Sequence, residues 1–273
     1  MSEIIEKASE LNNTEENIIE VNDITIRFNK STEKIDDLKE YFVKLIKGQL
    51  MFQEFLALQN VSLNIKRGEA WGIIGTNGSG KSTLLKAISK ILKPYKGTVT
   101  VRGSVASLIE LGAGIDPRLT ARENIYLNGC LLGHSKKFIQ EKFDEIVEFA
   151  ELWDFLDSPV KNFSSGMKSR LGFAVATMVE PDILIVDEVL AVGDVLFRKK
   201  CMKKMEQMRN DGTTLIIVSH NMNQIYEMCN KAIWLNKGKV VKQGDAKEVC
   251  DEYLETIEAK KAKEKADSKK TAG

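Results

Sequence analysis

Nine consecutive residues of the chain have the composition of a phosphate-binding loop. Residues 75–83 read GTNGSGKST, which fits the pattern G-x-x-x-x-G-K-[ST]. A diphosphate held by consecutive backbone N–H groups leaves no room for large side chains, and glycines allow both that approach and positive φ angles. Lys81 would place its charge on the terminal phosphates, and Ser82 would offer a hydroxyl to Mg²⁺. The predicted phosphate-binding residues are Gly75, Thr76, Asn77, Gly78, Ser79, Gly80, Lys81, Ser82 and Thr83.

An acidic pair, Asp187 and Glu188, follows the apolar run ILIV at 183–186. A strand buried on both faces delivers such residues to its carboxyl end, where ligands bind in open α/β sheets. Asp187 is expected to hold Mg²⁺ through water. Glu188 is then placed to polarise an attacking water as the general base. The loop and the pair together predict hydrolysis of a bound phosphate ester or anhydride.

Two further polar segments permit either a structural or a functional interpretation. Residues 162–168, NFSSGMK, precede an apolar helical pattern, so Ser164 or Ser165 can simply be a helix N-cap. His220 ends the apolar run LIIVSH, and a single histidine in that position is more often structural than catalytic. Neither segment alone predicts a function.

Strands and helices alternate along the chain in a way that positions these residues. Ile24, Ile26 and Phe28 alternate with polar residues, as in a half-buried strand, and Val61 and Leu63 repeat the pattern. Short apolar runs predict buried strands, and longer segments with helical periodicity separate them. This order indicates an α/β fold with a mostly parallel sheet covered by helices on both faces, and an antiparallel β annex near the N-terminus. Strands are predicted at 70–74, 97–101, 105–109, 183–186, 215–218, 232–235 and 239–242, and helices at 81–91, 120–132, 137–150, from 164, 195–210, 221–229 and from 246.

Three segments do not fit this alternation of strands and helices. Residues 1–17 are acidic and polar, which predicts a flexible N-terminus. Residues 30–57 separate two strands by more than a hairpin needs, and apolar residues within 35–47 share one helical face, which predicts an inserted amphipathic helix. Residues 258–273 hold six lysines and three acids with almost no apolar residue, which predicts a disordered tail. The globular domain is therefore expected at 18–257.

Composition excludes several classes of protein. The chain has 273 residues and a formal net charge of +1, so wholesale electrostatic binding to nucleic acid is not expected. It contains no run of about 18 apolar residues, so no membrane span is expected, and its N-terminus lacks the features of a signal or transit peptide. The four cysteines are scattered without C-x-x-C spacing, which is typical of reduced cytosolic thiols.

Taken together, the motifs resemble the nucleotide-binding subunit of an ABC transporter. The loop 75–83, FSSGM at 163–167, ILIVDE at 183–188, AVGD at 191–194 and His220 occur in the family's order and spacing. The resemblance covers about residues 18–245. It implies a P-loop NTPase (RecA-like) core, with a helical subdomain near 110–170 that carries the signature segment.

The resemblance also implies roles for individual residues. It implies a head-to-tail homodimer with two ATP molecules at the interface, where the loop of one subunit faces the signature of the other. Asp194 falls in the family's D-loop, His220 would contact the γ-phosphate, and Phe28 stands where the family usually stacks an aromatic on adenine. A core role for Phe28 is the alternative. The implied trans contacts are Ser164, Ser165, Gly166 and Met167.

Departures from the family pattern point to one subfamily. The signature is usually LSGGQ, and here Ser165 replaces a glycine and Met167 a glutamine. The usual glutamine between the two halves falls near Glu110, whose carboxylate could still approach Mg²⁺. With LIELGAG and ENIYLNG (123–129), these variants look like the ATPases that export polysaccharides of the O-antigen, capsular and teichoic acid type.

The resemblance therefore implies an ATPase, with ATP and Mg²⁺, that drives export of a lipid-linked glycan. A separate transmembrane permease, expected in two copies, would anchor it at the cytoplasmic face of the cell membrane. The alternatives are an ATPase of a drug or nutrient transporter, or a soluble ABC ATPase. A repair-type ATPase is disfavoured because only 83 positions separate Lys81 from Ser164, which leaves no room for a long coiled coil.

Overall fold

A six-stranded sheet forms the centre of the protein. The structure is a computed structural model, which describes residues 16–31, 52–108, 115–187 and 194–271. The strand order is β5-β6-β7-β3-β8-β9, in which the first five strands are parallel and β9 pairs antiparallel with β8. The mostly parallel sheet predicted from the sequence is confirmed. The strands are β3 (Ala70–Ile74), β5 (Val105–Ser107), β6 (Ile183–Val186), β7 (Thr214–Val218), β8 (Lys231–Asn236) and β9 (Lys239–Asp245).

A separate antiparallel sheet of three strands forms the predicted annex. Its order is β2-β1-β4, with β1 (Asn17–Ser31) between β2 (Phe52–Lys66) and β4 (Lys96–Val101). The β1–β2 pairing continues to Ser31 and Phe52, so the predicted insert is bounded too widely. Residues 30–31 and 52–57 belong to the strands, because pairing with the opposite strand satisfies their backbone N–H and C=O groups. The predicted amphipathic helix at 35–47 and most of the predicted flexible segment 1–17 lie outside the described residues.

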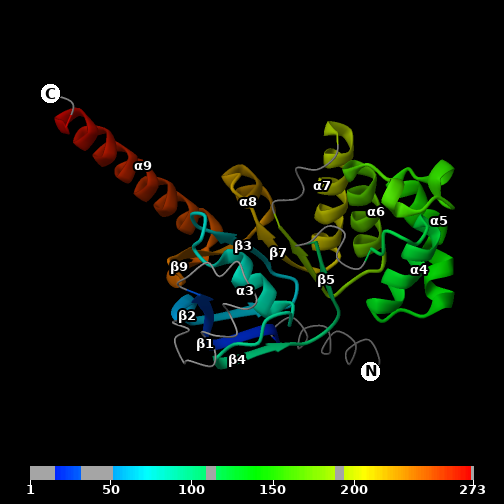
Figure 1. Ribbon diagram of the computed structural model, residues 1–273, viewed down its shortest axis with the longest axis horizontal. Helices are drawn as coiled ribbons and strands as arrows, with labels where there is room; N and C mark the ends of the chain where they lie inside the picture. Colours follow the sequence, from blue (N-terminus) through cyan, green and yellow to red (C-terminus); the bar gives the residue numbers. More distant parts are fainter. Residues whose placement is uncertain (1–15, 32–51, 109–114, 188–193, 272–273) are drawn as a thin grey trace, which may run out of the picture.

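Helix α3 (Lys81–Ile88) lies between the two sheets (Figure 1). Its apolar face, which includes the fully buried Leu84, Leu85 and Ile88, packs in one core cluster with alternate residues of the parallel strands and with β1 and β2. The helix ends earlier than the predicted residue 91. Lys90 has a positive φ of 59°, which breaks the helical path.

The remaining helices cover the other face of the central sheet and build a subdomain beside it. A second core cluster joins the alternate strand residues, such as Leu184, Val186 and Ile217, to these helices. Helices α4, α5 and α6 form the subdomain (Figure 1), which confirms the predicted helical segments there. The helices are α4 (Ala121–Leu131), α5 (Lys136–Ala150), α6 (Ser165–Met178), α7 (Val195–Asn210), α8 (Met222–Met228) and α9 (Ala246–Thr271), with short 3₁₀ turns at Trp153–Phe155 and Val160–Asn162.

Helix α9 corrects the prediction for the tail. It packs on β8 and β9 near its start and then continues away from the body of the protein to Thr271 (Figure 1). Residues 258–271 of the segment predicted to be disordered are therefore helical. Ala, Glu and Lys are strong helix formers, so a helix already nucleated on the core can extend through them without an apolar face. Among the described residues, no helix combines the length and the apolar character needed to cross a membrane.

Candidate nucleotide-binding site

The loop 75–83 joins β3 to α3 at the carboxyl edge of the central sheet. Gly75, Gly78 and Gly80 have φ angles of 145°, 74° and 108°. A Cβ on Gly80 would lie 2.7 Å from Leu58 Cδ2 and 2.8 Å from Ala57 O, and a Cβ on Gly75 would overlap Leu235 O. Glycine is thus required by the backbone conformation and by close packing at both ends of the loop.

Two segments remote in sequence hold this loop in place. The N–H of Gly238, in the β8–β9 turn, donates to Ser79 O at 2.9 Å. Gly238 O in turn accepts from Gln59 N of β2 at 2.8 Å. The loop is therefore wedged between the annex and the β8–β9 hairpin, which limits its freedom before any ligand binds.

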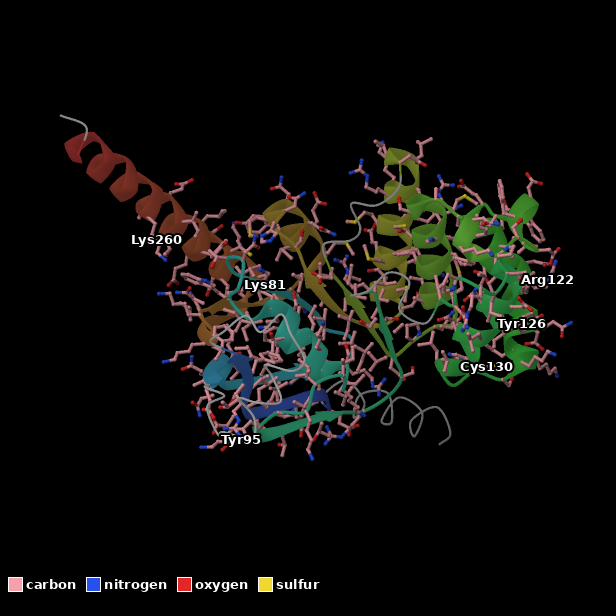
Figure 2. All side chains as sticks on the ribbon, viewed as in Figure 1. Lys81, Tyr95, Arg122, Tyr126, Cys130 and Lys260 are labelled. Atoms are coloured by element: carbon pink, nitrogen blue, oxygen red, sulfur yellow. The ribbon has the colours of Figure 1, made fainter. Side chains whose placement is uncertain are left out.

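Lys81 lies in the first turn of α3, far from Arg122 and Tyr126 of the helical subdomain (Figure 2). Its Nζ donates to Gly75 O at 2.9 Å and to Thr76 O at 3.2 Å. The ammonium group is thus held across the loop. Gly80 is the N-cap of α3 and offers no side-chain cap, so N–H groups of the first turn are available to an anion.

A pocket of about 520 Å³ opens over the loop. Asp187 contributes from the end of β6, and the annex contributes two aromatic rings. Phe28 and Phe55 are 41% and 54% exposed although both line the pocket. The lining residues are Phe28, Phe55, Ala57, Asn77, Gly78, Gly80, Lys81, Ser82, Thr83, Asp187 and Val218.

The order of the strands explains why Asp187 meets the loop. β6, β7 and β3 are neighbours in the sheet, so residues after their carboxyl ends share one edge. His220 follows β7 at the same edge and is exposed. It does not line the pocket within the described residues. Ser219 Oγ fixes the turn before it, donating to Gln224 Oε1 at 2.9 Å and accepting from Asn221 N at 3.0 Å.

Two of the Mg²⁺ ligands predicted from the sequence, Ser82 and Asp187, are among the described residues. Ser82 and Asp187 line the same pocket, and a hydroxyl with a carboxylate is a donor set that suits this cation. The described residues therefore fit the ion. Glu110 and the predicted general base Glu188 lie outside the described residues.

The segment 164–167 lies at the start of α6, in the helical subdomain. Ser164 is the N-cap and accepts from Met167 N at 3.2 Å, which confirms the capping interpretation. Ser164 and Ser165 are exposed. A Cβ added to Gly166 would meet only Ser164 Oγ, at 3.8 Å, among the residues that the structure describes. The helix N-terminus thus presents an open surface rather than a packed one.

The family model for ABC transporters matches residues 58–191. The chain is 45% identical over 214 residues to an O-antigen export system ATP-binding protein, RfbB, of Klebsiella pneumoniae, which covers 78% of this chain and 85% of that protein. The chain belongs to the family of ABC transporter ATPases. A teichoic acids export ATP-binding protein, TagH, of Lactiplantibacillus plantarum is 43% identical over 252 residues, covering 92% of this chain and 68% of that protein. TagH of Bacillus anthracis is 43% identical over 234 residues, which is 42% of its length.

Solved structures support the same assignment. The ATP-binding cassette MJ0796, in a dimeric post-hydrolysis state bound to ADP and Pi, is 25% identical, has a TM-score of 0.67, and covers 84% of this chain and 98% of its own. An ATP-binding subunit of an ABC transporter has a TM-score of 0.68 at 21% identity, and it covers 86% of this chain and 93% of its own. At that identity it shows the fold alone, which is the P-loop NTPase fold predicted from the sequence.

An ion-pair network of this ABC ATPase joins α6 to Asp194, the residue predicted to lie in the D-loop. Asp194 is the N-cap of α7 and accepts from Phe197 N at 2.9 Å. Arg170 of α6 donates to both Asp194 and Glu151, and Lys200 reaches Glu151 at 3.2 Å. The Phe197 N–H and the Arg170 guanidinium hold the pKa of Asp194 below its ordinary value, against the opposing effect of burial. Sequence reasoning did not identify Arg170, whose type alone gives no signal.

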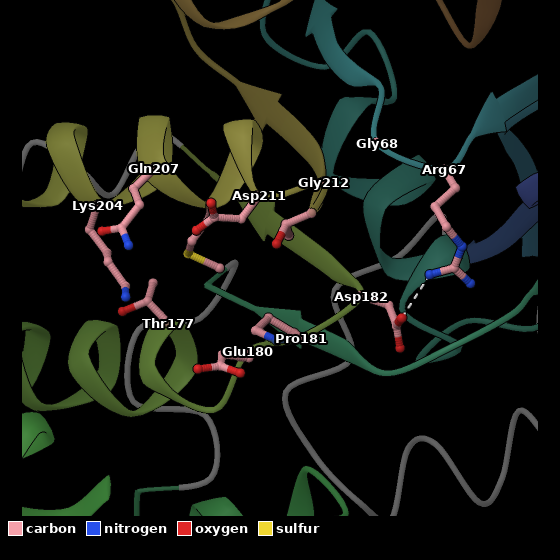
Figure 3. Close-up of a pocket in the computed structure, with 12 residues that line it drawn as sticks. Arg67, Gly68, Thr177, Glu180, Pro181, Asp182, Lys204, Gln207, Asp211 and Gly212 are labelled. Carbon is pink, nitrogen blue, oxygen red and sulfur yellow. Dashed lines mark hydrogen bonds and ion pairs between the residues drawn. The ribbon is translucent and has the colours of Figure 1, made fainter. Parts of the chain in front are cut away.

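A second hollow, of about 660 Å³, lies at the opposite edge of the sheet (Figure 3). Arg67 Nη1 donates to Asp182 Oδ1 across it at 2.8 Å, and Asp182 Oδ2 accepts from Ser104 N and Oγ. Burial alone would raise the pKa of Asp182, but these hydrogen bonds lower it overall. The charges of Arg67 and Asp182 thus neutralise each other, and the hollow is lined by the loops that precede β3, β6 and β7.

Phe55 and Ala57 are pocket residues that sequence reasoning missed. Both lie on β2, within residues 30–57, which are predicted to form an insert because they separate two predicted strands by more than a hairpin needs. The sequence does hold a signal, since Phe55 and Ala57 are in phase with the apolar positions Val61, Leu63 and Ile65, and only the polar Gln59 interrupts the alternation.

Proposed function

We propose that this ATPase powers the export of a lipid-linked polysaccharide, of the O-antigen, capsular or teichoic acid type, across the cell membrane. The observation that carries the proposal is the identity of 43–45% to O-antigen and teichoic acid export ATP-binding proteins over most of this chain. The departures at Ser165 and Met167 and near Glu110 agree with it.

The pocket explains how ATP would be held. The loop amides and the first turn of α3 receive the phosphates, and Lys81 exchanges its loop carbonyl partners for the terminal phosphates. The base would lie toward Phe28, which lines the annex side of the pocket. Ser82 and Asp187 would hold Mg²⁺, which neutralises charge on the phosphates when bound. These contacts would orient the γ-phosphate toward the carboxyl edge of the sheet.

Residues at that edge would activate the attacking water. Glu188, one residue beyond Asp187, is assigned the role of general base, which takes a proton from the water. His220 follows the neighbouring strand and is assigned contact with the γ-phosphate. Glu110 would approach Mg²⁺ from the segment that precedes the helical subdomain.

One chain supplies half of each composite site. Ser164, Ser165, Gly166 and Met167 lie on the helical subdomain, apart from the loop of the same chain. In a head-to-tail homodimer the capped N-terminus of α6 would point its positive dipole end at the partner's γ-phosphate. Support comes from the openness around Gly166 and from the dimeric state of the MJ0796 cassette. ATP would then close the dimer, and hydrolysis would open it.

Transport requires a path through the membrane, which the described helices do not supply. A separate permease, in two copies for a dimer of ATPases, would provide that path. The ATPase would then lie as a peripheral protein at the cytoplasmic face of the cell membrane.

The test is export in the cell. Deletion of the gene should remove the surface polysaccharide and leave lipid-linked glycan inside, and the wild-type chain should restore export. Lys81→Ala should not restore it, whereas Lys93→Ala, which removes an exposed lysine after α3, should. Normal surface polysaccharide in the deletion strain, with lost drug resistance or nutrient uptake, would contradict the proposed cargo and leave the ATPase assignment intact.

A further inference from the structure

Two phenylalanines face each other across the annex at the mouth of the nucleotide pocket. In the β1–β2 register Phe28 pairs directly with Phe55. Side chains of a directly opposed antiparallel pair project from the same face, with Cβ atoms about 4.5–5.5 Å apart. Phe28 and Phe55 therefore form one aromatic surface, and both residues line the pocket.

Both rings of this surface are exposed to solvent. Phe55 is 54% exposed and Phe28 41%, whereas Ile26 and Leu58, the next pair toward the core, are buried. Two adjacent exposed phenylalanines keep apolar area in water that a ligand could cover. An aromatic base is a ligand that matches their shape and chemistry, because every base has a π face that stacks on such rings.

The surface is fixed relative to the phosphate loop. Two residues along β2 from Phe55, Ala57 also lines the pocket, and its carbonyl oxygen lies against Gly80 of the loop. Gln59 is tied to Gly238, which is itself bonded to Ser79. The distance between the rings and the phosphate-binding amides is thus set by backbone contacts, which favours a ligand that spans both.

The opposite face of the same strands is already occupied by protein contacts. Arg27 Nη1 donates to Glu54 Oε1 at 2.7 Å, and the Arg27 guanidinium lies 3.6 Å from the centre of the Tyr95 ring. Leu56, the partner of Arg27 in the register, is 38% exposed on that face. The two faces are therefore chemically distinct, and only the Phe28–Phe55 face adjoins the loop.

We propose that Phe55 is a second base-stacking residue, so that the base of the bound nucleotide packs on a surface built by Phe28 and Phe55 together. The proposal rests on ATP binding at the loop and is independent of the exported cargo. Stacking on one aromatic ring changes affinity by about 5- to 150-fold in other proteins. Because Phe28 remains in a Phe55 variant, loss of Phe55 should weaken nucleotide binding by about 5- to 10-fold.

Calorimetric titration of the purified full chain with ADP and with inorganic tripolyphosphate tests this directly. Phe55→Ala should weaken ADP binding by that factor and leave tripolyphosphate binding unchanged, because tripolyphosphate has no base. Leu56→Ala is the matched control, since it removes an exposed apolar side chain from the neighbouring position on the other face. It should change neither affinity.

Two further variants separate stacking from a structural role. Phe55→Trp should retain ADP affinity, and its added fluorescence should be quenched by ADP but not by tripolyphosphate, after subtraction of the wild-type signal. The double variant Phe28→Ala/Phe55→Ala should lose a free energy of ADP binding that differs from the sum of the losses in the two single variants, because both rings contact one base.

Three results would overturn the proposal. They are unchanged ADP affinity in Phe55→Ala, an equal loss for tripolyphosphate, and a tryptophan signal that ADP does not alter. Failure of the wild-type chain to bind either ligand would instead refute the site at the loop. Normal nucleotide binding in a chain that exports no polysaccharide would refute only the proposed cargo.

Discussion

Replacement of Gly166 by alanine should make the protein slightly more stable and much less active. Gly166 has no positive φ angle, and a Cβ there would meet only Ser164 Oγ at 3.8 Å within the described part of the chain. It lies in the first turn of α6, where alanine is the better helix former. The fold of the single subunit therefore does not require glycine at position 166.

The expected change in the free energy of unfolding differs between Gly166 and Gly80. Gly166→Ala should raise the free energy of unfolding by about 0.5 kcal/mol, part of the full helix-interior difference between the two residues. Gly80→Ala forces a Cβ to within 2.8 Å of two atoms at a φ of 108°. Backbone strain and overpacking together should lower its free energy of unfolding by about 2–5 kcal/mol.

The ATPase activity of the Gly166→Ala variant should fall, although its stability should rise. If the start of α6 approaches the partner's γ-phosphate, a methyl group holds the two subunits apart, and misplacement by about 1 Å can cost roughly 100-fold in rate. We expect kcat to fall by about 10- to 100-fold with little change in nucleotide affinity. Urea unfolding and steady-state ATP hydrolysis are measured on the same preparation. Full hydrolysis by a stable Gly166→Ala variant would refute the composite site, and a destabilised variant would refute the open geometry around Gly166.

Three other variants test neighbouring parts of the structure. Glu188→Gln should slow hydrolysis by about 10²–10⁴-fold, because the amide accepts no proton, and light scattering should detect a dimer with ATP but not with ADP; rapid hydrolysis would remove Glu188 from the role of base. Arg170→Ala should lower kcat more than it changes nucleotide affinity, since Asp194 and Glu151 lose a shared partner, and a partial rescue by Arg170→Lys would distinguish charge from packing. Asp182→Asn should lower the free energy of unfolding at pH 7 by about 1 kcal/mol, after allowance for solvent screening. The pKa of Asp182 is lowered in the folded state, so its contribution is present above the unfolded value of about 3.9 and is lost as the pH falls through the folded value; an equal loss at pH 3 and pH 7 in chemical denaturation would contradict this.

The elements of the central sheet could be predicted because each is determined by its own residues. The runs 183–186 and 215–218 are apolar on both faces, and such runs suit buried parallel strands. The loop was predictable for the same reason, since its glycines, Lys81 and Ser82 are adjacent in sequence.

Features that depend on contacts between distant segments could not be predicted in this way. The pairing of Phe28 with Phe55 spans 27 positions, and the tie between Ser79 and Gly238 spans far more. The prediction for the helical tail is wrong for a different reason. It gives more weight to the absence of an apolar face than to the helix propensity of the residues in the segment. Composition identifies what a segment cannot bury, but it does not decide whether an existing helix continues.

The ion pairs of Arg170 join α6 of the helical subdomain to the N-terminus of α7. Asp187, in the nucleotide pocket, is only seven positions before Asp194 in the chain. Asp194 caps α7 and is bonded to Arg170, which lies one helical turn after the signature segment on α6. A displacement of Asp194 would therefore act on α6 through Arg170. In the proposed dimer the start of α6 contacts the nucleotide of the partner, so Arg170 links that contact to Asp194. If the two sites of the proposed dimer are coupled through this network, Arg170→Ala should reduce the cooperativity of ATP hydrolysis, which steady-state rates at increasing ATP concentration would measure.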